Sequence, residues 1–154
     1  MDKNKKVNND LESMTDDEII EKLLCENELP TKTVFMKRLE IPVKLKALTA
    51  KQVSKLRDQC TSTDKVKGRE IRKFDNDAFN MGLIVKATVS PNWNSSKLLN
   101  GLKVSSGEEV IKRKLLAGEL DSLGDEVLDL SGFNDELKDI ETIKNSSSPD
   151  TNLA

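Results

Sequence analysis

The segment at residues 77–89 is the most apolar in the chain, and it constrains the fold more than any other feature. Its apolar residues are Ala78, Phe79, Met81, Leu83, Ile84, Val85, Ala87 and Val89. At helical spacing they lie on almost every side, and such a helix needs neighbours all round it. We therefore expect a central helix, ended by Pro91. Gly82 costs about 1 kcal/mol relative to Ala inside a helix, so it predicts a close contact with a second helix.

Capping signals predict several helices around this one. Thr15 with Glu18, and Thr49 with Gln52, have the spacing of a capping box, in which each side chain bonds the other residue's backbone N–H. Ser106 precedes a helix whose first turn holds Glu108 and Glu109. Acidic residues are favourable at helix N-termini. We therefore interpret the two acidic clusters, Asp16-Asp17-Glu18 and Glu108-Glu109, as capping groups and not as metal ligands. A last helix follows Gly118 and ends at residues 131–132, where Gly132 supplies the cap.

Residues 34–47 change to a period of two, which is typical of a half-buried strand. A lone strand leaves its backbone groups unpaired, so we expect a β-hairpin near residues 33–47 that turns near Glu40. Pro42 lacks an N–H group and predicts an edge strand.

Residues 61–73 are predicted to be a polar loop. The loop holds five basic residues: Lys65, Lys67, Arg69, Arg72 and Lys73. Such a loop can contact phosphate. No aromatic residues interleave with the charges, so a solvated connection is the favoured interpretation.

The predicted fold class is α+β and predominantly α-helical, with a small N-terminal β-hairpin packed on a bundle of about five to six helices. Only 36% of residues are hydrophobic and 34% are charged, so both ends are expected to lie outside the core. We predict a disordered arm over residues 1–13, a mostly helical domain over 14–133, and a tail over 134–154. The tail is expected to be weakly helical around Leu137, Ile140 and Ile143 and then disordered.

The composition argues against several function classes. The chain has no histidine, the usual general base and metal ligand, and no tyrosine. Cys25 and Cys60 match no zinc spacing, and we expect both to be buried thiols on helices. No signal peptide, membrane span or phosphate-binding glycine motif is found. The net charge of −2 argues against nucleic acid as a partner. We predict no catalytic residue, no cofactor-binding residue and no metal site, and therefore not an enzyme.

Four apolar residues are the candidates for contact with a partner: Trp93, Leu98, Leu99 and Phe133. Trp93 either anchors a partner, as lone Trp residues often do, or caps the core. Leu98 and Leu99 belong to a short helical turn that Asn100-Gly101 is expected to close. Phe133 follows the glycine at a helix end, a position from which a side chain often folds back onto its helix, so a core position is favoured.

Three blocks of the sequence resemble the XkdN-like tail assembly chaperones of long-tailed phages and phage-derived tail particles. They are residues 38–49 (RLEIPVKLKALT), residues 79–92 from Phe79-Asn80 to Pro91-Asn92, and residues 108–133, which contain Leu115-Leu116-Ala117-Gly118-Glu119-Leu120 and end in Val127-Leu128-Asp129-Leu130-Ser131-Gly132-Phe133. The resemblance as a whole extends over roughly two thirds of the chain. The last block is the most specific. Ala117 departs from the family, which has proline there.

The resemblance implies a helical chaperone that binds the tape measure protein while the tail is built, and that is absent from the mature particle. It implies no enzymatic activity or cofactor, and a location in the cytoplasm of the bacterial host. The tail tube protein and a second copy of the chain are further candidate partners. Grooves that accept apolar residues at i, i+4 and i+7 of a partner helix suit this role. Two alternatives stay open: a structural tail component or connector, and a small nucleic-acid-binding regulator that uses residues 65–73.

Overall fold

The computed structural model describes residues 13–134, and these fall into two compact units. The first unit contains helix α2, Asp16–Leu24, and the second spans Leu29–Asn134. The predicted disordered arm and weakly helical tail lie outside the described residues, except for Ser13 and Asn134.

Helix α2 begins as predicted. The Thr15 hydroxyl accepts a hydrogen bond from the Glu18 N–H, and the Thr15 N–H donates to the Glu18 carboxylate, both at 3.3 Å. This confirms the capping box. The helix has no buried residue. Its apolar side chains are all exposed: Ile19, Ile20, Leu23 and Leu24.

The second unit is built on a three-stranded antiparallel sheet. Its strands are β1 (Thr31–Met36), β2 (Ile41–Lys46) and β5 (Thr88–Ser90), in the order β1-β2-β5. The predicted hairpin is therefore confirmed, and Glu40 takes the left-handed conformation at its turn (φ 55°). The expectation that Pro42 lies on an edge strand is wrong, because β2 is the middle strand. The chain tolerates Pro42 there because β5 pairs only at Lys44 and Leu45.

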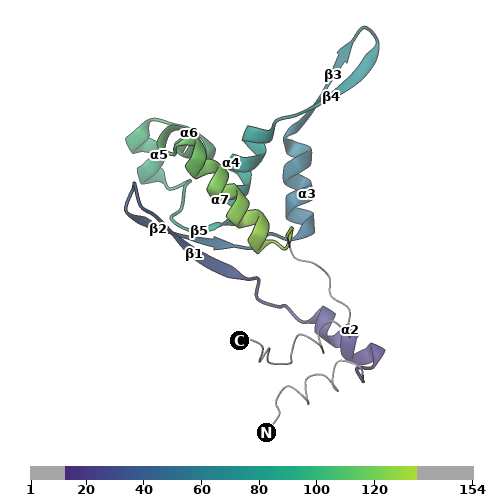
Figure 1. Cartoon of the computed structure of the whole chain (residues 1–154). Coiled ribbons are helices and arrows are strands. Elements are labelled where there is room, and N and C mark those ends of the chain that lie inside the picture. Colours follow the sequence, from purple (N-terminus) through teal and green to yellow (C-terminus); the bar gives the residue numbers. More distant parts are fainter. Residues whose placement is uncertain (1–12, 135–154) are drawn as a thin grey trace, which may run out of the picture. The chain divides into compact units, whose positions relative to one another are not determined.

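Five helices complete the second unit: α3 (Ala50–Gln59), α4 (Asn76–Ala87), α5 (Ser96–Leu102), α6 (Gly107–Lys114) and α7 (Ala117–Leu130). Figure 1 shows α4 and α7 over the sheet. Alternate residues of β2, Val43 and Leu45, are fully buried, whereas the residues between them are exposed. The sheet thus has one face on the core and one in solvent.

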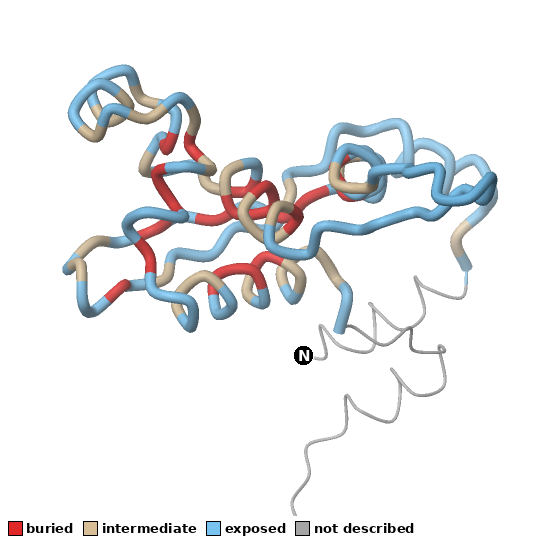
Figure 2. The backbone as a smooth tube through the Cα atoms, turned by 90° about the horizontal axis from the view of Figure 1, so that it is seen from above, coloured by how far each residue is buried: buried red, intermediate tan, exposed pale blue. Residues whose placement is uncertain are grey.

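Helix α4 occupies the predicted central position. It contacts α3, α6, α7 and β2, and its Leu83 and Ile84 are completely buried. Figure 2 shows the buried positions gathered in the interior of the body, with exposed positions toward its periphery. Burial of each such side chain stabilises the fold by about 1.5–3 kcal/mol.

The predicted end of this helix is wrong. It ends at Ala87, and Thr88–Ser90 form strand β5. Thr88 pairs with Leu45, and Val89 is exposed. β-branched residues fit a strand well, and pairing with β2 outweighs one more helical turn.

The close helix contact predicted at Gly82 is confirmed. A Cβ atom there would lie 2.6 Å from Cδ1 of Leu56 on α3. The missing side chain lets α3 and α4 approach each other.

The polar loop predicted at residues 61–73 is wrong. Strands β3 (Thr61–Val66) and β4 (Arg69–Phe74) form an antiparallel hairpin. Lys67 and Gly68 both have positive φ, 52° and 75°, as the tight two-residue turn of a hairpin requires. The local signal for this hairpin is Gly68, which lies between two stretches that contain β-branched residues.

Two smaller predictions also need correction. Helix α5 continues through Asn100 and Gly101 to Leu102, and Lys103 in the left-handed conformation (φ 55°) ends it. The cysteines are not buried on helices: Cys25 is exposed and Cys60 is half-buried, and each caps a helix C-terminus. A residue at a helix C-terminus has no following helical turn to pack against its side chain, so both thiols are more accessible than predicted.

Gly107 and Gly101 provide a matched test of the packing. A Cβ at Gly107 would lie 2.9 Å from Cβ and 3.1 Å from the backbone carbonyl carbon of Trp93, whereas nothing lies within 4 Å at Gly101. We expect Gly107→Ala to destabilise the protein by about 1–3 kcal/mol through overpacking. Gly101→Ala is expected to stabilise it by up to about 1 kcal/mol, because Ala is the better helix former. Urea unfolding of both variants measures the difference, and effects of the same sign contradict the packing described.

Candidate functional site

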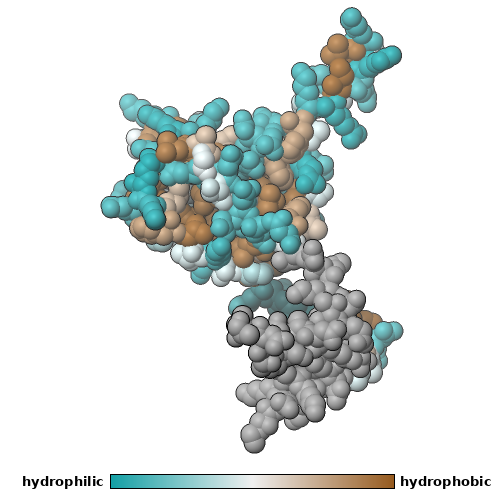
Figure 3. All heavy atoms as spheres, in the orientation of Figure 1, coloured by the Kyte–Doolittle hydropathy of each residue, from teal (hydrophilic) through white to brown (hydrophobic). Residues whose placement is uncertain are grey.

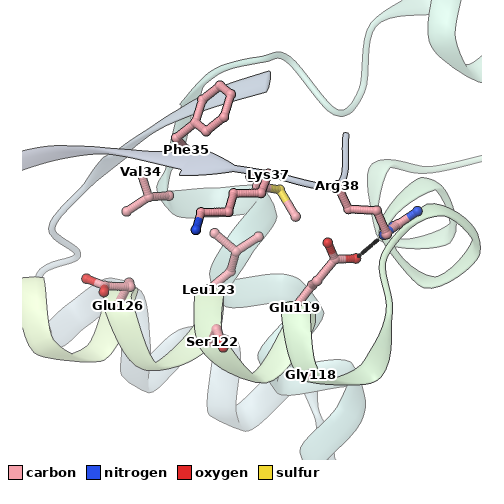
Figure 4. A pocket seen from close by; sticks show the side chains of 10 residues that line it. Val34, Phe35, Lys37, Arg38, Gly118, Glu119, Ser122, Leu123 and Glu126 are labelled. Carbon is pink, nitrogen blue, oxygen red and sulfur yellow. Dashed lines mark hydrogen bonds and ion pairs between the residues drawn. The ribbon is translucent and has the colours of Figure 1, made fainter. Parts of the chain in front are cut away.

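A groove of about 430 Å³ lies between strand β1 and helix α7 (Figure 4). Its lining comprises Val34, Phe35, Met36, Lys37 and Arg38 on one side, and Gly118, Glu119, Ser122, Leu123 and Glu126 of α7 on the other. The groove exists because α7 packs on the middle strand β2, while β1 is the outer strand of the sheet.

The floor of the groove is apolar. Strand side chains alternate between the two faces of a sheet, so Val34 and Met36 share the face toward α7. Figure 4 shows Val34 directed toward α7 and Phe35 directed away from it. Met36 and Leu123 are buried, whereas the Phe35 ring is 63% exposed.

Two ion pairs join the walls of the groove. Lys32 Nζ lies 2.6 Å from Glu126 Oε2, and Arg38 Nη2 lies 2.7 Å from Glu119 Oε1. Arg38 also donates through Nε to Glu119 at 3.0 Å and through Nη2 to the Lys114 carbonyl at 2.6 Å. These contacts bridge β1 and the turn after it to α7.

The Arg38 hydrogen bonds lower the pKa of the Glu119 carboxyl below its ordinary value, and the Leu116 N–H, which donates at 2.8 Å, lowers it further. Both bonds favour the charged carboxylate. Burial has the opposite effect and is the smaller cause.

The four predicted contact residues lie away from this groove. Trp93 is 5% exposed and packs in the core, and its indole N–H has no hydrogen-bond partner among the described residues. Leu98 and Leu99 on α5 are half-buried against the core. Leu98 also lines a shallow hollow with Pro91 and Leu102.

Phe133 is 54% exposed, so the prediction that it packs into the core is wrong. Gly132 (φ 88°) ends α7 as predicted. The Phe133 N–H donates to the Leu128 carbonyl at 3.1 Å, and the Gly132 N–H donates to the Asp129 carbonyl at 3.1 Å. These bonds form a Schellman cap, which leaves the Phe133 ring at the surface.

Of the acidic pair at the start of α6, Glu109 takes part in the helix cap, as predicted, and Glu108 lies in the first turn. The Ser106 hydroxyl accepts from the Glu109 N–H at 3.3 Å, and the Glu109 carboxylate accepts from the Ser105 N–H at 2.9 Å. Over residues 13–134, no group of three or more Cys, Asp or Glu side chains is placed to hold a metal ion. Burial raises the pKa of the Cys60 thiol, which makes it a weak nucleophile at neutral pH.

None of the described helices is long and apolar enough to cross a membrane.

The sequence did not indicate the groove. Arg38 and Glu119 are 81 positions apart, and no local pattern pairs them. The alternation of Val34 and Met36 in a strand next to Lys32 was the only local signal, and it marks a half-buried strand without saying what covers it.

The Glu119 pair predicts a pH-dependent contribution to stability. Because the folded pKa is lowered, the contribution is fully present above the ordinary Glu pKa of about 4.3 and is lost as the pH falls through the lower, folded value. Wild type should therefore melt above Glu119→Gln at pH 7, and the two melting temperatures should converge as the pH falls well below 4.3. Thermal unfolding followed by circular dichroism between pH 7 and about 3 measures this. A constant gap across that range would contradict the ion pair.

The groove and the helical body can be compared with known proteins. The family model of the phage XkdN-like tail assembly chaperone protein matches residues 20–144. The chain is 29% identical to YqbN of Bacillus subtilis strain 168 and 28% identical to XkdN of the phage-like element PBSX in the same organism. Each match extends over 129 residues and covers 73% of this chain and 87% of the relative.

The crystal structure of YqbN shares the fold. It superposes with a TM-score of 0.55 at 21% identity, covering 71% of this chain and 90% of that one. Ala117, where the resemblance leads us to expect proline, is the first residue of α7, a helix position that favours proline. The chain belongs to the family of phage XkdN-like tail assembly chaperones.

Proposed function

We propose that this chaperone binds the tape measure protein in the host cytoplasm during tail assembly, that it acts without enzymatic activity, and that it is absent from the finished particle. The groove between β1 and α7 is the observation that carries the proposal, together with membership of the tail assembly chaperone family.

The chemistry of the groove suits an amphipathic helix. Such a helix presents apolar residues at i, i+4 and i+7, and it recognises apolar grooves with charged margins. The apolar floor at Val34 and Leu123 accepts these residues, while Lys32 with Glu126 and Arg38 with Glu119 offer charges of both signs at the walls. A helix of the tape measure protein, still outside the tail tube, is the occupant that we propose.

The residues predicted from the sequence supply two further parts of the proposed contact surface. Phe133 is 54% exposed at the C-terminal end of α7, and Leu98 lies at the shallow hollow beside α5. In this proposal Leu99 and Trp93 contribute through packing in the core and not through direct contact, because Leu99 is half-buried and Trp93 is almost completely buried.

The open groove also suits release. Its ion pairs are exposed, and exposed pairs exchange readily with water and salt. A chaperone that leaves before the tail is complete requires exchangeable contacts of this kind.

Ser122→Arg tests the groove. Ser122 is exposed on α7 and lines the groove, so an arginine there fills it without disturbing the core. We expect the variant to lose tape measure binding by about tenfold or more, since a charge placed against an apolar anchor costs several kcal/mol. Binding is measured by co-purification from cells that express both proteins, and then by titration with purified helical segments of the tape measure protein.

Ser54→Arg is the matched control. Ser54 is also an exposed serine within a helix, on α3, and lies outside the groove. The Ser54→Arg variant should bind the tape measure protein as wild type does. Equal loss in both variants, or wild-type binding by Ser122→Arg, would rule out the groove as the contact site, and failure of the wild type to bind would overturn the proposed function itself.

Purified particles distinguish a chaperone from a structural tail component. We expect quantitative mass spectrometry to detect the tube and tape measure proteins in mature particles and to find this chain absent, while lysates taken during assembly contain it. A fixed number of copies per particle would instead assign the chain to the tail structure.

A further inference from the structure

The hairpin β3–β4 projects from the body as an arm, which we define as residues 61–74 (Figure 1). All twelve residues of its two strands are exposed except Thr61, which is half-buried. Outside itself, the arm packs mainly on α3. It therefore contributes little to the core of the second unit.

The arm leaves apolar surface and strand edges uncovered. In its register Asp64 pairs with Ile71 and Val66 pairs with Arg69, so Ile71 and Val66 lie on the same face. These two side chains are 42% and 47% exposed, and Figure 3 shows apolar atoms on the arm surrounded by hydrophilic ones. A two-stranded hairpin is at best marginally stable in water, and both of its edges remain free to pair. A covering surface would stabilise it.

The charge of the arm differs in sign from that of the rest of the chain. Residues 61–74 contain five basic and two acidic residues, which gives a net charge of +3. Since the whole chain carries −2, the remaining residues carry −5. The arm thus complements the remainder of its own sequence.

Helix α7 is the acidic counterpart. It contains five acidic residues and no basic residue. Glu119 and Glu126 already pair with Arg38 and Lys32 at the groove. The other three, Asp121, Asp125 and Asp129, recur every four residues and are exposed, so they form one stripe along the helix.

The stripe is available for a partner. Within residues 13–134 none of its three carboxylates forms an ion pair, although Asp129 accepts a hydrogen bond from Asn134. Leu116, at the N-terminal end of α7, is 57% exposed and adds apolar surface to this end of the helix.

From this complementarity we infer that the arm of one copy docks on the acidic stripe of α7 in a second copy of the same chain. The arm of a given copy packs on α3 and not on its own α7, so the contact forms between copies. Pairing of two arms would bring two charges of +3 together, whereas docking on α7 brings opposite charges together. The docked stripe is distinct from the apolar floor of the groove, so self-association does not rest on tape measure binding.

A charge-reversal pair tests the inference. The arm variant is Lys65→Glu/Arg69→Glu/Arg72→Glu, and the helix variant is Asp121→Lys/Asp125→Lys/Asp129→Lys. Sedimentation velocity of the full chain should show a dimer or larger assembly for wild type that weakens at ~0.5 M NaCl. Each variant alone should lose association by about tenfold or more, because like charges then face each other.

Mixing the two variants gives the decisive result. The acidic arm of the arm variant complements the basic α7 of the helix variant. The wild-type arm of the helix variant likewise complements the wild-type α7 of the arm variant. An equimolar mixture should therefore associate again. A control for the arm variant, Lys51→Glu/Lys55→Glu/Lys97→Glu, lowers the net charge by the same amount at exposed helix positions and should associate as wild type does. Circular dichroism verifies that each variant is folded.

Several outcomes would overturn the inference. They are a monomeric wild type at all concentrations, variants that still associate, or a mixture that stays monomeric. A monomeric wild type that binds a DNA duplex, with binding lost in the arm variant, would assign the arm to nucleic acid. Tape measure binding by the monomeric helix variant would show that the two contacts are independent, so loss of self-association leaves the proposed function standing.

Discussion

Leu83 and Ile84 of α4 are removed from water by three other helices and by strand β2, and the body of the second unit is arranged around this burial. Helix α7 packs mainly on α4 and also on β2, so it covers the outer strand β1 only in part. The groove thus results from the position that α7 takes when its apolar face packs on α4 and β2. A larger sheet-facing surface on α7 would close the groove and leave a better-packed but less open protein.

Local signals in the sequence predicted local structure well. The capping boxes at Thr15 and Thr49 and the apolar helix around Leu83 are each determined by neighbours within a few positions, and the structure confirms them. Strand β5 was missed because Thr88 and Val89 continue an apolar helical pattern, and only the remote strand β2 makes them extended. The groove could not be predicted because it depends on β1 and α7, which are far apart in the chain.

Three surfaces outside the core differ in chemistry. The groove is apolar with paired charges, the arm is basic, and the solvent face of α7 is acidic. No polar or charged residue is buried among the described residues, so the core is held together by apolar packing. The two proposed contacts lie on surfaces of different chemistry, which would allow two partners to be bound without competition.

The small buried area of the arm affects its local unfolding and its tolerance to substitution. Because residues 61–74 bury almost nothing in the body, the hairpin can unfold locally while α4 and its neighbours stay folded. Hydrogen exchange of the arm would then be fast and largely independent of global stability. Substitutions of exposed residues in the arm are therefore expected to carry little folding penalty, so the charge of this segment can change while the body stays the same.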